Sequence, residues 1–197
     1  MSYSQNSEES YIIDYFRDIP NGKFIDIGAF HVFMFSNVRA LFEQGWSGVL
    51  VEPAPSNYKA IADHYEGEER IKVLNVAIGE TTGEIDFYES DGDAVGTSDE
   101  GHMTKWGNAG VKYTKIKVPQ VSVAEFMEQY AKDIDFLSID TEATNMAVFR
   151  SIPEYVWRQI KMACIEHDLH QEEIKETLSE YGFFTLYVNG ENIILAK

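Results

Sequence analysis

Carboxylate side chains stand at the ends of short apolar runs throughout this sequence. They are Asp26, Glu52, Asp140, Glu142, Glu166 and Asp168, and the last two flank His167. A carboxylate in such a place can accept hydrogen bonds from ligand hydroxyls, hold a hard divalent cation, or take a proton from a reacting group. Polar groups gathered at the ends of buried segments are hard to explain as core residues, so the pattern favours a ligand site.

A general base and a metal ligand set are both conceivable among these side chains. His167 is a candidate general base, although a single histidine at the end of a strand is more often a hydrogen-bonded structural residue. Asp140 with Glu166 or Asp168 could chelate a divalent cation, but any acidic crevice has spare carboxylates. We therefore assign no metal ligands and keep a divalent cation as an alternative.

The apolar runs are too short for helices and are typical of buried β-strands. Strands are predicted over residues 24–27, 49–53, 71–78, 135–142 and 160–165. Segments with helical spacing separate them, over residues 36–44, 55–65 and 122–131. This alternation predicts an α/β fold with a mostly parallel sheet. Because the carboxyl ends of parallel strands share one edge, the six carboxylates and His167 are expected to converge on one crevice.

The first strand and the second strand each end in a feature that suits a nucleotide-type ligand. The first runs into Gly28, and a glycine turn at the ligand edge of an α/β sheet lets backbone N–H groups approach a ligand closely. The second ends at Glu52, about 20 residues further on, where such folds hold ribose hydroxyls with a bidentate carboxylate. The two signals together are stronger than either alone.

The two ends of the chain carry their own predictions. An amphipathic helix is expected over residues 7–20, so that residues 1–21 cover one face of the sheet. Near the other end, a helix over residues 171–181 precedes strands at 183–188 and 192–196. The turn between these two strands is typical of an antiparallel hairpin.

The middle of the chain is expected to be less regular. Residues 83–88 alternate in polarity and are predicted to pair with the strand at 71–78 through a hairpin turn at 80–83. Residues 112–121 alternate like an exposed edge strand. Residues 90–110 lack periodicity and form either a lid loop over the ligand edge or a mobile surface excursion.

Length and composition bound the possible functions. The 197 residues suffice for one domain with a substantial core, and a hydrophobic content of 44% argues against disorder. The single cysteine, Cys164, fits a reducing compartment. No apolar run has membrane-spanning length, so we expect a cytoplasmic protein that does not enter a membrane. A net charge of −17 repels phosphate backbones, so a nucleic-acid substrate is not expected. The oligomeric state is not readable from the sequence.

Several segments together carry a resemblance to a known family. They are residues 22–29, 35–37, 45–53, 75–79 and 135–142. In their order and spacing they resemble the FkbM-type family of class I S-adenosylmethionine-dependent methyltransferases, over almost the whole chain. The resemblance implies a Rossmann-like sheet that is mostly parallel, with a C-terminal antiparallel hairpin and helices on both faces. It also implies S-adenosylmethionine as methyl donor and a hydroxyl acceptor on a small molecule, sugar or glycan.

The resemblance also assigns roles by position. Asp26, Gly28 and Ala29 match the donor-binding turn, and Ser36 lies in the segment that follows it. Glu52 matches the acid that holds the ribose, and Asn75 to Ala77 match the stretch beside the adenine. Asp140 and Glu142 match the acidic motif after the fourth strand. In the implied in-line transfer, Asp140 or Glu142 orients the acceptor and His167 takes its proton.

Four residues beside this candidate site depart from the family pattern. His31 and Val32 follow the turn where an acidic or small residue and then glycine are usual, and Ala143 and Asn145 replace a glycine and an acidic residue. A β-branched Val32 could clash where backbone passes close to the donor. Two functions therefore stay open. One is O-methyl transfer, and the other is non-catalytic binding of a small molecule by a protein of this fold whose donor pocket is altered or lost.

Overall fold

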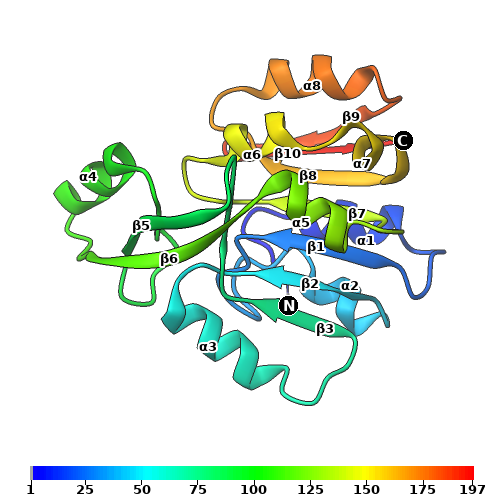
Figure 1. The fold of residues 1–197 in the computed structure, drawn as a ribbon. Coiled ribbons are helices and arrows are strands. Elements are labelled where there is room, and N and C mark those ends of the chain that lie inside the picture. Colours follow the sequence, from blue (N-terminus) through cyan, green and yellow to red (C-terminus); the bar gives the residue numbers. More distant parts are fainter. Residues whose placement is uncertain (1) are drawn as a thin grey trace.

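The centre of the fold is a seven-stranded β-sheet, as the computed structural model shows for residues 2–197 (Figure 1). Its parallel strands are β1 (Lys23–Ile27), β2 (Ser47–Val51), β3 (Ile71–Leu74), β7 (Phe136–Ile139) and β8 (Met162–Glu166). Strands β9 (Phe184–Val188) and β10 (Asn192–Ala196) form an antiparallel hairpin. The order across the sheet is β3-β2-β1-β7-β8-β10-β9. The predicted α/β fold, mostly parallel with a C-terminal antiparallel hairpin, is confirmed.

Helices cover both faces of this sheet, and each layer buries its own apolar core (Figure 1). One face carries α1 (Glu8–Tyr15), α2 (Arg39–Glu43) and α3 (Pro55–His64). The other face carries α5 (Val123–Tyr130), α6 (Asn145–Ser151), α7 (Glu154–Gln159) and α8 (Gln171–Ser179). Burial of both sheet faces explains why β1, β7 and β8 are continuous apolar runs rather than alternating ones.

Local sequence signals set several helix boundaries. Helix α3 begins at Pro55, whose fixed φ suits the first helical turn. The Ser122 hydroxyl accepts a hydrogen bond from the N–H of Glu125 (3.3 Å) and caps α5, as predicted. Helix α2 begins at Arg39 rather than at Ser36, because the Ser36 hydroxyl accepts the N–H of Arg39 (3.1 Å) from outside the helix. Helices α6 and α7 were not predicted.

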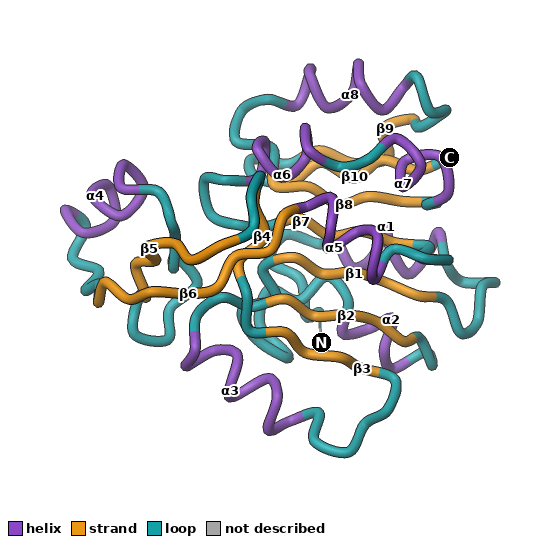
Figure 2. Tube along the Cα trace, viewed as in Figure 1, coloured by secondary structure: helices purple, strands orange, loops and turns teal. Residues whose placement is uncertain are grey.

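A smaller three-stranded sheet stands beside the carboxyl ends of the parallel strands (Figure 2). Its strands are β4 (Ala77–Gly79), β5 (Gly83–Glu89) and β6 (Thr114–Ser122), in the order β4-β6-β5. Helix α4 (Glu100–Asn108) lies between β5 and β6 in the chain and at the outer end of this sheet (Figure 1). The segment projects past the edge at which ligands bind in open α/β sheets.

The sequence predictions for this smaller sheet are wrong in three respects. Residues 71–78 do not form one strand, because the chain leaves the large sheet after Leu74 and enters the small one at Ala77. Strand β5 pairs with β6 and not with residues 71–78, so residues 80–83 are not a hairpin turn. Strand β6 is the central strand of its sheet and not an edge. Its alternating polarity arises because one face of this small sheet is open to solvent.

Residues 90–110 also differ from the expectation of an aperiodic loop, since they contain α4. The side chain of Asp99 caps this helix by accepting the N–H of His102 (2.6 Å). The many polar residues and glycines of this segment, and its lack of any fully buried helical residue, conceal the helix in the sequence.

The N-terminal segment contacts the loop after β1 and the turn between β9 and β10. The carbonyl of Tyr3 accepts the N–H of Ser36 (3.1 Å), and the buried carboxylate of Glu8 accepts the side-chain amide of Asn189 (2.6 Å) beside β10. Met1, the first residue of the predicted cover over residues 1–21, lies outside the described residues. Within residues 2–197 no helix is long and apolar enough to cross a lipid bilayer.

Candidate active site

A cavity of about 480 Å³ opens at the carboxyl edge of the large sheet. The turn after β1 and the end of β2 form one side of it. The loops after β7 and β8 form the other side, and the segment between β5 and β6 closes it from above. The predicted crevice therefore exists, and the small sheet with α4 encloses it further.

Gly28 brings the turn after β1 into direct contact with the end of β7. It has a φ of +93°, and a Cβ at this position would lie 1.6 Å from the carbonyl oxygen of Asp140. The N–H groups of Gly28 and Ala29 both donate to the carbonyl of Val51 (2.9 and 3.0 Å). The glycine is thus required for close backbone packing, while these two N–H groups are engaged within the fold.

Glu52 places a buried carboxylate in the cavity wall. One carboxylate oxygen accepts the N–H of Phe30 (2.9 Å) and the other accepts the N–H of Ala54 (2.8 Å). Burial raises the pKa of Glu52 to about 7, although these two hydrogen bonds oppose the shift. Each oxygen keeps a lone pair, so the carboxylate is placed to accept two further hydrogen bonds from a ligand.

Of the other residues predicted to bind the methyl donor, one lines the cavity and the rest lie behind its wall. Ala77 lines the cavity, whereas Asn75 lies behind it and donates from its side chain to the carbonyls of Glu52 and Pro53 (2.9 and 3.0 Å). Asp26, Ala29 and Ser36 are buried on the far side of the turn, outside the lining. Burial raises the pKa of Asp26 to about 6, and the hydroxyl of Ser138 opposes the shift. These residues hold the turn rather than face the cavity.

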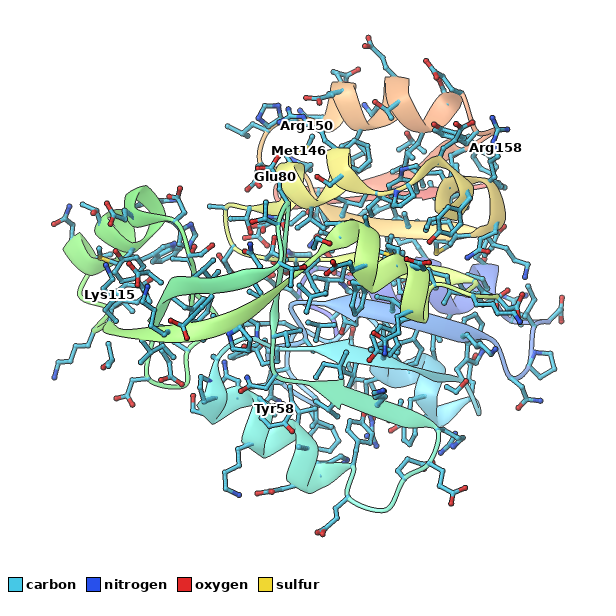
Figure 3. The ribbon with its side chains drawn as sticks, in the orientation of Figure 1. Tyr58, Glu80, Lys115, Met146, Arg150 and Arg158 are labelled. Atoms are coloured by element: carbon cyan, nitrogen blue, oxygen red, sulfur yellow. The ribbon has the colours of Figure 1, made fainter. Side chains whose placement is uncertain are left out.

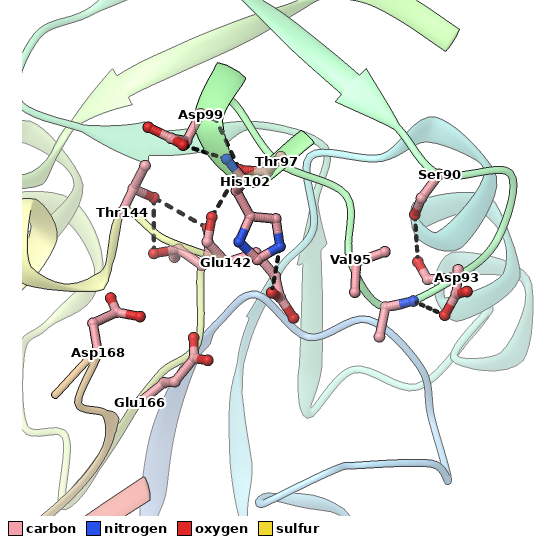
Figure 4. A network of polar contacts seen from close by, with 12 residues as sticks. Ser90, Asp93, Val95, Thr97, Asp99, His102, Glu142, Thr144, Glu166 and Asp168 are labelled. Carbon is pink, nitrogen blue, oxygen red and sulfur yellow. Dashed lines mark hydrogen bonds and ion pairs between the residues drawn. The ribbon is translucent and has the colours of Figure 1, made fainter. Parts of the chain in front are cut away.

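The acidic residues after β7 and β8 meet on the opposite wall. Asp140, Glu142, Glu166 and Asp168 all line the cavity. Figure 4 shows the last three of them. Asn145 joins the two loops, since its amide group donates to Glu166 and to Asp168 (3.0 Å), and its carbonyl oxygen accepts the N–H of Thr141 (2.6 Å). These contacts hold Glu166 and Asp168 against the loop after β7.

Crowding of like charges perturbs this acidic group. Burial, followed by the charges of Glu142 and Asp168, raises the pKa of Glu166 to about 7. Burial, followed by the charges of Glu166 and Glu142, raises the pKa of Asp140 well above its ordinary value. Both shifts favour the protonated forms of these two side chains.

His167 lies outside the cavity lining, and it is almost fully buried. Its Nδ1 accepts the N–H of Leu169 (3.1 Å), and its Nε2 lies 3.1 Å from the carbonyl of Asn189, to which it can donate. Both ring nitrogens are thus engaged by backbone, which fits a neutral structural histidine. The structure does not bring His167 to the carboxylates with which it was grouped.

Helix α4 contributes side chains to the cavity that the sequence analysis did not select. His102, Lys105 and Trp106 line it from above. Nε2 of His102 lies 3.1 Å from a carboxylate oxygen of Glu142 (Figure 4). Among the described residues, the indole N–H of Trp106 is buried without a hydrogen-bond partner. The one available sequence signal was Asp99, which caps the helix three residues before His102, but the segment lacks the helical periodicity that would have identified the helix.

The residues that depart from the family pattern do not obstruct the cavity. Val32 is buried in the core beneath the turn, outside the lining, so its side chain does not narrow the cavity. His31 accepts the N–H groups of Phe33 and Met34 (both 3.0 Å) and thereby shapes its own loop. Ala143 has a φ of +75°, the left-handed conformation that glycine adopts most easily.

Cationic side chains lie mainly away from this site. Arg150 and Arg158 are on the outer surface of α6 and α7, where they pair with Glu173 and Glu154 (Figure 3). Within residues 2–197, no group of three or more histidine, cysteine or acidic side chains has an arrangement suited to a metal ion. The carboxylates of the cavity therefore carry no assigned metal.

Comparison with known proteins gives one family and several structural relatives. The family profile described as the methyltransferase FkbM domain matches residues 26–185. The solved structure of methyltransferase FkbM from Methylobacillus flagellatus KT is similar with a TM-score of 0.54 and 12% identity. That match covers 90% of this chain but only 44% of the other, so this chain spans less than half the length of that relative. No curated protein sequence matches significantly.

Two further solved structures share the fold over most of both chains. A protein assigned as a caffeoyl-CoA O-methyltransferase from Staphylococcus aureus has a TM-score of 0.52 and 11% identity, over 98% of this chain and 84% of the other. Precorrin-6y C5,15-methyltransferase from Geobacter metallireducens GS-15 has a TM-score of 0.50 and 11% identity, over 96% and 87%. At such identities the likeness concerns the fold alone.

Proposed function

We propose a specific reaction for this chain, which belongs to the methyltransferase FkbM family. In this reaction it transfers the methyl group of S-adenosylmethionine to a hydroxyl of a small molecule, sugar or glycan. Methyl transfer in general follows from the family. The donor, the hydroxyl and the class of acceptor are our proposal.

The observation that carries the proposal is the carboxylate of Glu52 in the cavity wall. It is held by two backbone N–H groups and is buried enough to raise its pKa to about 7. A buried carboxylate with free lone pairs is costly unless a ligand supplies donors. The two ribose hydroxyls of S-adenosylmethionine are such donors, and this position in the fold is where nucleotide-type ligands place them.

The rest of the cavity suits the same donor. Ala77 and Ile78 offer an apolar wall beside Glu52 for the adenine, and the tight turn at Gly28 leaves room at the centre of the edge. When bound, S-adenosylmethionine supplies a methyl group activated by a positively charged sulfur. Glu142 and Asp168 lie across the cavity, and their negative charges favour a positive sulfonium over the neutral product.

The acceptor is proposed to enter from the side of α4. There Trp106 lines the cavity, which suits an acceptor with a flat or ring-shaped body. The net charge of −17 and the acidic lining support a small molecule or glycan rather than nucleic acid. A cytoplasmic location is also proposed, supported by the buried free thiol of Cys164.

Calorimetric titration with S-adenosylmethionine tests the proposal. We expect micromolar binding by the wild type. Replacement of Glu52 with alanine is expected to weaken the affinity for S-adenosylmethionine about 10–100-fold, because the hydrogen bonds to a charged carboxylate are lost. Exposed Glu80→Ala is the matched control and should bind like the wild type, with circular dichroism confirming that each variant is folded.

Val32→Gly addresses the altered-pocket alternative in the same experiment. Because Val32 packs in the core and not in the cavity, this variant should not bind the donor more tightly than the wild type. If the wild type fails to bind S-adenosylmethionine and Val32→Gly binds it, the proposal is refuted. The alternative, a protein of this fold whose donor pocket is altered or lost, would then be favoured.

A further inference from the structure

His102 is held over the cavity by a chain of contacts that begins in the small sheet. The backbone of Thr97 pairs with Tyr88 of β5 (2.8 and 3.1 Å), and its hydroxyl accepts the N–H of Asp99 (3.0 Å). Asp99 in turn caps α4 by accepting the N–H of His102 (2.6 Å). The same Thr97 hydroxyl donates to the carbonyl of Glu142 (2.7 Å). One buried threonine therefore fixes the helix that carries His102 to the loop that carries Glu142 (Figure 4).

The two ring nitrogens of His102 have different surroundings. Nε2 is buried and lies 3.1 Å from Oε2 of Glu142, although the two atoms are not aligned as a full hydrogen bond. Catalytic hydrogen bonds are often loose before substrate binds. Nδ1 makes no hydrogen bond to any of the described residues, and the side chain lines the cavity. A carboxylate beside Nε2 favours the proton on that nitrogen and leaves the lone pair on Nδ1.

The groups around His102 would favour its positive form once it gains a proton. Glu142 faces it from the loop after β7, and Lys105 lies on its own helix. The other acidic side chains of the same cavity are Glu52, Asp93, Asp140, Glu166, Asp168 and Glu191. This surplus of carboxylates over cations stabilises an imidazolium formed during reaction.

The other candidate bases are less suited to the task. His167 has both nitrogens engaged by backbone and does not line the cavity. Burial and neighbouring carboxylates raise the pKa of Asp140 well above its ordinary value, which favours its protonated form, and Glu166 is engaged by the side-chain amide of Asn145. His102 has a free nitrogen, a carboxylate partner and a place in the cavity wall.

We propose that His102 takes the proton from the acceptor hydroxyl and that Glu142 is its positioning residue. This inference rests on the proposed O-methyl transfer. The acceptor oxygen forms a bond to the methyl carbon, and the bond from that carbon to sulfur breaks with its electron pair moving to sulfur. The hydroxyl proton moves to Nδ1 of His102, and Glu142 stabilises the resulting imidazolium. The proposed base thus lies on α4, so the segment that encloses the cavity also supplies the proton acceptor.

Nitrogen-15 NMR of the imidazole rings tests this assignment without an acceptor. In the presence of S-adenosylhomocysteine at about pH 8, we expect neutral His102 with its proton on Nε2 and a bare Nδ1. Glu142→Gln should reduce the preference for that tautomer, while the exposed His170 serves as an internal reference that does not change. A proton on Nδ1, or a tautomer unaffected by Glu142→Gln, overturns the proposal.

Turnover supplies the second readout. A panel of methyl glycosides and catechols is offered as hydroxyl acceptors with saturating S-adenosylmethionine. His102→Gln is expected to lower kcat about 10²–10⁴-fold with little change in the KM for the donor, whereas His170→Gln keeps the wild-type rate. An active His102→Gln overturns the proposal. Calorimetry on the same samples separates the two ideas, because loss of donor binding by the wild type refutes the proposed function while the NMR result still decides the state of His102.

Discussion

At the scale of single residues, the candidate site depends on a few positions where backbone and side chain have no freedom to change. Gly28 is the clearest, since its backbone lies against the carbonyl of Asp140. Glu52 is the second, since two N–H groups fix its carboxylate in the cavity wall. One position determines the shape of the site and the other determines its charge.

Gly28→Ala should destabilise the protein by about 3 kcal/mol, because the new methyl group overlaps the Asp140 carbonyl and alanine disfavours a φ of +93°. Gly67→Ala separates these two causes. Gly67 has a φ of +81° but no atom within 4 Å of the added Cβ, so this variant should lose only about 1 kcal/mol. Urea unfolding measures both, and equal losses would show that the contact with Asp140 is not tight.

The raised pKa of Glu52 makes donor binding depend on pH. The ionised carboxylate accepts ribose hydroxyls better than the neutral acid, and its pKa is about 7 in the free protein. Affinity for S-adenosylmethionine should therefore fall about tenfold between pH 8 and pH 6. In Glu52→Gln most of this dependence should vanish. A wild type whose affinity is constant across this range would exclude Glu52 as the ribose partner.

At the scale of elements, the large sheet could be read from the sequence and the small one could not. Apolar runs such as that of β7 are long enough and buried enough to identify a parallel sheet. Strand β4 is short, β5 and β6 are half exposed, and their pairing is set by contacts far apart in the sequence, such as the parallel ladder of β4 with β6. Helix α4 has no buried residue at helical spacing, so nothing in its pattern predicts it.

The same limit applies to the site. The carboxylates at the strand ends were predictable because parallel strands bring their ends to one edge, and Glu52, Asp140 and Glu142 do line the cavity. Asp26 was not distinguishable from them by sequence, because one residue of register decides which face of β1 it occupies. His102 could not be placed, because its position depends on the small sheet.

The capping contact of Asp99 offers a test of how α4 is held. Asp99→Ala removes the acceptor for the His102 N–H and should loosen α4 by about 1 kcal/mol. We expect faster amide hydrogen exchange in residues 100–108 and unchanged protection in β1 and β7. The control is Asp91→Ala, an exposed residue of the same segment outside α4. Equal protection of α4 in all three proteins would show that the cap does not hold the helix.

At the scale of the whole molecule, acidic side chains gather in a buried region, where a negative charge is most costly. The chain carries a net charge of −17, and several of its carboxyl groups are buried near one cavity without cationic partners. A bound donor with a positive sulfur relieves this repulsion. Stability and ligand binding should therefore respond to pH together.

Buried carboxyl groups with raised pKa values set the sign of the pH effect on folding. Asp26, Glu52 and Glu166 have pKa values of about 6, 7 and 7, above those of the unfolded chain. The folded state then holds more protons between about pH 4.5 and pH 7, so stability is greater at the acidic end and is lost as pH rises through this window. Thermal unfolding should give a higher Tm at pH 5.5 than at pH 8. The opposite order would show that these groups are ionised at little cost.

The most direct test of the central claim is a crystal structure of the complex with S-adenosylhomocysteine. We predict that both ribose hydroxyls lie within hydrogen-bond distance of the Glu52 carboxylate, with the adenine beside Ala77 and the sulfur near Asp140. A ligand bound elsewhere, or a cavity that stays empty at saturating concentration, would contradict the account of this edge of the sheet as a methyl-donor site.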